Sequence, residues 1–68
     1  MRDKNRIWEF TNEFSGLWMK TVPDWRFGQL VMNFFGWISH TKGIDPFFPE
    51  EDRMITYFEE YCETLKTE

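Results

Sequence analysis

Two side chains of this sequence, His40 and Cys62, could do chemistry together, as a metal-binding pair or as a thiol–imidazole dyad. They are the chain's one histidine and one cysteine, and two ligands fall short of the three or four that a zinc site uses. Cys62 also falls on the apolar stripe of a predicted helix, where a free cysteine behaves as a small hydrophobic residue. The neighbouring carboxylates at 50–51 and 59–60 diverge on a helix and do not converge on one substrate. We therefore predict no catalytic residue, no metal site and no cofactor.

A polar strip of three residues, Arg26, Gln29 and Asn33, is a second candidate site. Positions i, i+3 and i+7 align on one helix face, and these side chains offer donors and acceptors suited to a base edge or a peptide backbone. The alternative is structural: Arg26 and Gln29 tie down the acidic loop at Asp45 or Glu50, and Asn33 is solvated. Helix-turn-helix DNA binding is disfavoured, because the connection before the last helix exceeds the usual 3–4-residue turn and that helix is acidic.

Aromatic residues make up 21% of the chain, including 8 Phe and 4 Trp, and this surplus is its most informative feature. A domain of 68 residues cannot easily enclose all the rings beside its main apolar stripes, which are Trp8, Trp18, Trp25, Phe35, Trp37, Phe47, Phe48 and Tyr57. Trp and Tyr are enriched at protein interfaces. Two interpretations stay open: an exposed patch that binds a partner, or a flat aromatic core with half-exposed rings.

Three helices are predicted to position these residues. Over 3–20 and 49–65, apolar residues recur every three or four positions, as is typical of amphipathic helices. The Pro-Asp pair at the start of 23–39 reads as the first turn of a middle helix. The sequence thus predicts an all-α fold, a small three-helix bundle that forms a single domain over 1–68.

The predicted middle helix is apolar around much of its circumference. Besides its main stripe it carries a second apolar face with Trp25, Met32 and Phe35. A helix of this kind is normally central or contacts a partner, so these three residues are candidates for partner binding. Gly28 and Gly36 lie inside this helix, where glycine is unfavourable, and they predict the close approach of another backbone or side chain.

A longer, aromatic-containing connection is expected between the second and third helices, over 39–48. Asp45 precedes Pro46, and the residue before a proline is restricted to extended geometry. We expect Phe47 and Phe48 to tuck under this connection as a hydrophobic plug.

The net charge of −4 is unevenly placed. Residues 1–44 hold six basic and four acidic groups, for a net +2, whereas residues 45–68 hold two basic and eight acidic groups, for a net −6. An acidic surface repels phosphate backbones and attracts a basic patch on another protein. Glu59, Glu60 and Glu63 on the third helix therefore join the candidates for partner binding.

The sequence predicts neither membrane insertion nor secretion. Its longest apolar stretch, 30–38, is interrupted by Asn33 and is far shorter than the roughly 20 residues needed to span a bilayer. The first residues are charged and do not form the apolar segment of a signal peptide. A single cysteine fits a reducing compartment. We expect a cytoplasmic protein.

Two stretches carry a resemblance to a known group: residues 23–33, PDWRFGQLVMN, and residues 45–52, DPFFPEED. They resemble small uncharacterised proteins of Gram-positive bacteria and their phages, which read PDxRxGQxxxN, a gap, and then DxF(Y/F)xED. This resemblance implies no activity and no catalytic residue. It implies a setting, a bacterial or phage-infected cytoplasm, and a role in the interaction of mobile elements with host proteins.

Three hypotheses for function stay open. The leading one is a non-enzymatic protein-interaction module of phage or mobile-element origin. It would bind a bacterial host protein through an aromatic patch bordered by acids and inhibit it by occupying a basic, nucleic-acid-binding surface. The second is a structural homo-oligomer, such as a homodimer, in which the extra apolar face of the middle helix packs against its copy. The third is a nucleic-acid-binding regulator that uses Arg26, Gln29, Asn33 and the basic N-terminus.

Overall fold

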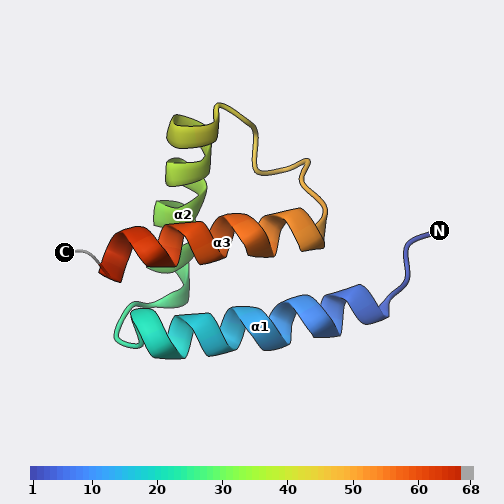
Figure 1. Cartoon of the computed structure of the whole chain (residues 1–68), viewed down its shortest axis with the longest axis horizontal. Coiled ribbons are helices and arrows are strands. Elements are labelled where there is room, and N and C mark those ends of the chain that lie inside the picture. The colour runs from blue at the N-terminus through green and yellow to red at the C-terminus, as the bar shows by residue number, and fades with distance from the viewer. Residues whose placement is uncertain (67–68) are drawn as a thin grey trace.

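A computed structural model describes residues 1–66 of the chain as three helices (Figure 1). They are α1 (Asn5–Thr21), α2 (Phe27–Lys42) and α3 (Glu51–Lys66), and the described residues contain no strand. The predicted all-α, three-helix fold is therefore confirmed.

The helix α3 is the central element of the arrangement. It runs beside α1 in the same direction, while α2 crosses behind it at a steep angle (Figure 1). The helix α3 packs against both other helices, but α1 and α2 do not pack closely against each other. They meet near the turn that joins them, where the ring centroids of Trp18 and Phe27 are 6.0 Å apart. The helices α1 and α2 therefore diverge from this turn.

The buried core comes from α2 and α3. Its members are Leu30, Phe34, Ile38, Met54, Phe58, Tyr61 and Cys62. Phe58 lies at its centre, 4.9 Å from Phe34 and 4.6 Å from Phe14 between ring centroids. The helix α1 contributes no fully buried residue and lays a stripe of partly buried rings against α3. One edge of that stripe is left uncovered.

The start of α2 differs from the prediction. Pro23 and Asp24 lie in a turn, in which the Trp25 N–H donates to the Val22 carbonyl at 3.1 Å, and the helix begins at Phe27. The Pro-Asp pair does not distinguish the two structures, because it is favoured in turns as well as in first helical turns. Trp25 consequently packs half-buried against the core and is not part of an outward face of α2.

The end of α2 also differs, because the helix continues to Lys42 and the connection shortens to 43–50. Gly43 has φ +66°, in the left-handed region, and its N–H donates to the Ser39 carbonyl at 3.2 Å. The glycine therefore ends the helix with a left-handed cap.

The two interior glycines of α2 do not permit a close approach within this chain. A Cβ atom added at Gly28 or at Gly36 would have no atom within 4 Å. The prediction of a close neighbour at these positions is wrong for the described chain, because α2 turns this face to solvent.

Opposite effects are expected from alanine at Gly36 and at Gly43. Gly36→Ala adds a side chain to open space in a helix and should raise the free energy of unfolding by about 0.5–1 kcal/mol. Gly43→Ala forces an L-residue into the left-handed region and should lower it by about 1 kcal/mol. Urea denaturation followed by circular dichroism measures both variants. A shift of the same sign in both would contradict the described cap.

No helix in the described range 1–66 is long and apolar enough to cross a membrane.

Candidate functional site

An apolar hollow beside the core is the candidate site, and we call it the aromatic groove. It is a cavity of about 450 Å³ between α1, α2, the 43–50 connection and the first turns of α3. Its lining residues are Ile7, Phe10, Thr11, Phe14, Phe27, Val31, Phe34, Phe35, Pro46, Phe47, Pro49, Glu51 and Met54. The groove exists because α1 and α2 diverge, which leaves the side of the core opposite α3 open.

The first wall of the aromatic groove is the uncovered edge of the α1 stripe. Ile7, Phe10 and Phe14 follow one another at helical spacing. The rings of Phe10 and Phe14 are stacked with centroids 5.6 Å apart, and Phe14 continues onto Phe58 of the core. Ile7 remains 51% exposed. This wall is thus anchored to the core at one end and open to solvent at the other.

The second wall comes from the first half of α2. Phe34 forms the floor with 2% exposure, whereas Phe27 and Phe35 stand beside it with 60% and 37% exposure. Met54 of α3 continues the floor and is buried. Large apolar side chains therefore surround the opening without closing it.

The rim is formed by the connection, where Phe47 and Phe48 are 84% and 73% exposed. The Asp45 carboxylate accepts the Phe47 N–H at 3.0 Å, and the Asp45 carbonyl accepts the Phe48 N–H at 3.2 Å. This turn directs both rings outward. The prediction of a buried plug is wrong, because Ile44 packs against the core in their place.

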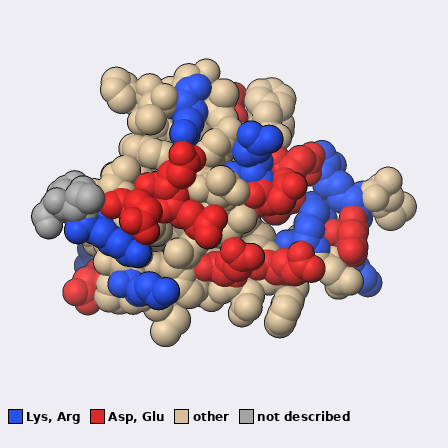
Figure 2. Space-filling model, viewed as in Figure 1, with Lys and Arg blue, Asp and Glu red and all other residues tan. Residues whose placement is uncertain are grey.

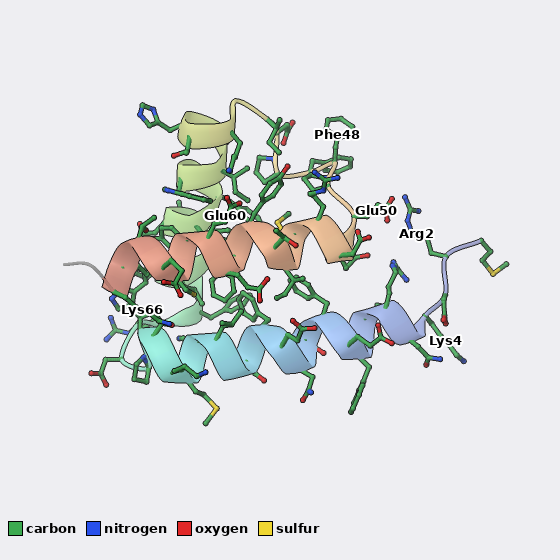
Figure 3. All side chains as sticks on the ribbon, viewed as in Figure 1. Arg2, Lys4, Phe48, Glu50, Glu60 and Lys66 are labelled. Atoms are coloured by element: carbon green, nitrogen blue, oxygen red, sulfur yellow. The ribbon has the colours of Figure 1, made fainter. Side chains whose placement is uncertain are left out.

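Charge is scarce at the aromatic groove. Glu51 is its one charged lining residue, and the Arg6 side chain donates to it at 2.7 Å. Beside this pair Arg2 donates to Glu50 at 2.7 Å, and the two side chains point toward one another in Figure 3. The hydrogen bond from Arg2 lowers the pKa of the Glu50 carboxyl below its ordinary value. Both acids at the start of α3 are thus paired with arginines that precede or begin α1.

Acidic side chains gather instead on the face that Figure 2 shows, over α3 and its seam with α1. None of the acidic candidates Glu59, Glu60 and Glu63 lines the aromatic groove. The apolar groove and the acidic face are therefore formed by different residues.

The acidic candidates of α3 are exposed on its outer side. Lys42 donates to Glu60 at 3.0 Å, and Lys66 donates to Glu63 at 3.2 Å. The Lys42 ammonium also lies 5.7 Å from the Trp37 ring centroid and 5.6 Å from that of Tyr57. Part of the acidic face is therefore neutralised within the chain.

The candidates predicted on the middle helix are separated from those acids. Arg26, Gln29 and Asn33 are exposed, and Met32 is 77% exposed on α2. Phe35 lines the aromatic groove, and it is the one residue among the nine predicted for partner binding that does so. The structural alternative places Arg26 and Gln29 at Asp45 or Glu50. The Glu50 carboxylate instead accepts hydrogen bonds from Arg2, and the Asp45 carboxylate accepts one from the Phe47 N–H.

His40 and Cys62 are not brought together as a reactive pair. His40 is exposed near the end of α2, whereas Cys62 is 1% exposed in the core. Burial raises the pKa of the Cys62 thiol, which disfavours the reactive thiolate. Among residues 1–66 no group of three or more His, Cys, Asp or Glu side chains could hold a metal ion.

Comparison with known proteins gives no relative from which a role could be transferred. No protein family, no curated protein and no solved structure matches this chain. The interpretation of the aromatic groove therefore depends on its own residues.

Proposed function

We propose that this protein is a non-enzymatic protein-interaction module whose docking site is the aromatic groove. The observation that supports this proposal is an open apolar hollow of about 450 Å³ beside the buried core. Ile7, Phe27 and Phe47 at its edges keep 51%, 60% and 84% of their surface in water. Contiguous apolar surface of this kind is typical of binding sites in small proteins, because its burial is the main favourable contribution to association.

The shape of the aromatic groove favours a helical segment as the docked element. The α1 wall runs from Ile7 to Phe14, or two helical turns, which is about 11 Å at the usual pitch. An amphipathic helix inserts apolar side chains at i, i+3 or i+4 and i+7 into a groove of this length. The partner segment would therefore present two or three large apolar residues along one face.

The partner that we propose is a bacterial host protein in the cytoplasm, and the origin that we propose for the chain is a phage or mobile element. Both proposals are supported by the resemblance of residues 23–33 and 45–52 to small proteins of Gram-positive bacteria and their phages. The acidic face of α3, which is separate from the aromatic groove, would meet basic side chains on another part of the same partner. Glu59 serves this purpose best, because Glu60 and Glu63 are already paired with lysines. Occupying such a basic surface would inhibit a partner that binds nucleic acid.

Affinity capture from a Gram-positive bacterial lysate tests this function with two variants of α1. Ile7 and Met19 are both exposed aliphatic residues, at 51% and 72%, but Ile7 lines the aromatic groove and Met19 does not. We expect the wild type to recover one host protein in a stoichiometric amount. Ile7→Asp should reduce the recovery at least about tenfold, because a carboxylate in an apolar pocket loses its hydration. Met19→Asp should leave it unchanged.

Circular dichroism first shows that both variants keep the helical fold. Equal recovery by the Ile7→Asp and Met19→Asp variants would exclude the aromatic groove as the docking site. A triple charge reversal at Glu59, Glu60 and Glu63 then tests the acidic face separately. Loss of capture in that variant alone would move the docking site to α3.

A further inference from the structure

We infer that, when no other protein is bound, a second copy of this chain fills the aromatic groove, with Phe47 of each protomer seated in the groove of its partner. The inference rests on the proposed function, because it assigns an occupant to the same docking site. Self-association and partner binding would then compete for the aromatic groove.

The distribution of charge favours this occupant. The chain has a net charge of −4, so two copies repel each other unless they meet through a neutral surface. The aromatic groove is such a surface, since Glu51 is its one charged lining residue and is paired with Arg6. The face drawn in Figure 2 instead carries charged side chains of both signs, which would lose hydration if a second copy covered them. Two copies therefore meet most favourably through the aromatic groove.

The surface is also complementary to itself. A twofold dimer uses the same patch on both subunits, so the patch must carry both a projection and the hollow that receives it. Phe47 projects from the rim with 84% exposure, and the 450 Å³ hollow that it borders is lined by aromatic rings. The Asp45 carboxylate accepts the Phe47 N–H, so the backbone that carries the ring needs little further ordering on binding.

The exposed apolar area fits a weak, reversible dimer. The exposed residues that line the groove are Ile7, Phe27, Phe35 and Phe47, at 51%, 60%, 37% and 84% exposure. With aromatic side chains offering about 150–250 Å² each, these residues expose roughly 450 Å² per chain. Two chains would bury roughly 900 Å², which is the size of a small interface that dissociates on dilution.

Sedimentation of the pure chain tests the inference with two exposed apolar residues. Phe47 and Met19 are 84% and 72% exposed, but Phe47 lines the aromatic groove and Met19 does not. We expect the wild type to be a dimer that dissociates on dilution. Phe47→Asp should weaken it about 30-fold or more, equivalent to about 2 kcal/mol, whereas Met19→Asp should leave the dissociation constant nearly unchanged.

Methyl NMR of the four isoleucines gives an independent measurement. Ile7 lines the aromatic groove, while Ile44 and Ile55 line other hollows and Ile38 is in the core. On dilution the Ile7 signal should move and the other three should stay. A monomer at every concentration, or equal effects of the two aspartates, would overturn the inference. A monomer that still captures a host protein through Ile7 would leave the proposed function intact, whereas a dimer that captures none would overturn only the function.

Discussion

Replacing Phe58 by alanine is expected to leave little or no folded protein at 37 °C. Phe58 is fully enclosed and contacts the ring of Phe14 from α1 and the ring of Phe34 from α2. Its truncation would therefore open a cavity where all three helices meet. Such a change typically lowers the free energy of unfolding by about 3–5 kcal/mol. A chain of this length has roughly 3–10 kcal/mol in total, at about 0.05–0.15 kcal/mol per residue.

Urea denaturation at 25 °C, followed by far-ultraviolet circular dichroism, measures this effect. Phe48→Ala is the matched control, because Phe48 is 73% exposed and its loss should change the free energy of unfolding by less than about 0.5 kcal/mol. A loss below about 1 kcal/mol for Phe58→Ala would mean that the ring is not at the centre of the core.

Alanine at Phe14 is expected to detach α1 from the other two helices. Phe14 is the α1 ring that contacts Phe58, and it also stacks on Phe10 and meets Trp18. The helix α1 has no fully buried residue to replace that contact. We expect the variant to lose about 2–4 kcal/mol, somewhat less than a fully enclosed ring because Phe14 is only partly buried.

Phe10→Ala is the control for this prediction, because Phe10 stacks on Phe14 and lines the same groove but has no ring contact with Phe58. It should cost about half as much as Phe14→Ala. Hydrogen exchange locates the change: in the Phe14→Ala variant the α1 amides should lose protection while those of α2 and α3 keep most of theirs. Equal loss of protection in all three helices would show that α1 does not open separately.

The three helices could be predicted from local pattern, and their ends less well. Apolar residues at three- and four-residue spacing identify a helix whatever it packs against, which is why α1 and α3 lie within two residues of the prediction. The predicted start of α2 is wrong because Pro23 and Asp24 suit a turn as well as a helix start. Gly43 could have identified the other end, since a glycine after the last helical residue is a common cap.

The aromatic groove could not be read from the sequence, because it results from the angle between α1 and α2. The residues of its walls, such as Phe10 and Phe27, follow the same periodicity as core residues. Whether such a ring is enclosed depends on whether another helix covers it, and periodicity does not contain that information. Of the predicted surplus rings, Trp8, Phe47 and Phe48 are indeed well exposed, while Trp18 and Trp37 pack against the core.

The position of α3 also has a consequence for how the protein is made. The last helix supplies Met54, Phe58, Tyr61 and Cys62 to a core that α1 and α2 cannot form by themselves, since those two helices hardly touch. The contact between Phe14 and Phe58 joins residues 44 positions apart. During synthesis α1 and α2 precede the helix that covers them, so their aromatic residues stay uncovered until α3 has been made. Uncovered apolar surface of this kind makes a partly made chain prone to aggregation.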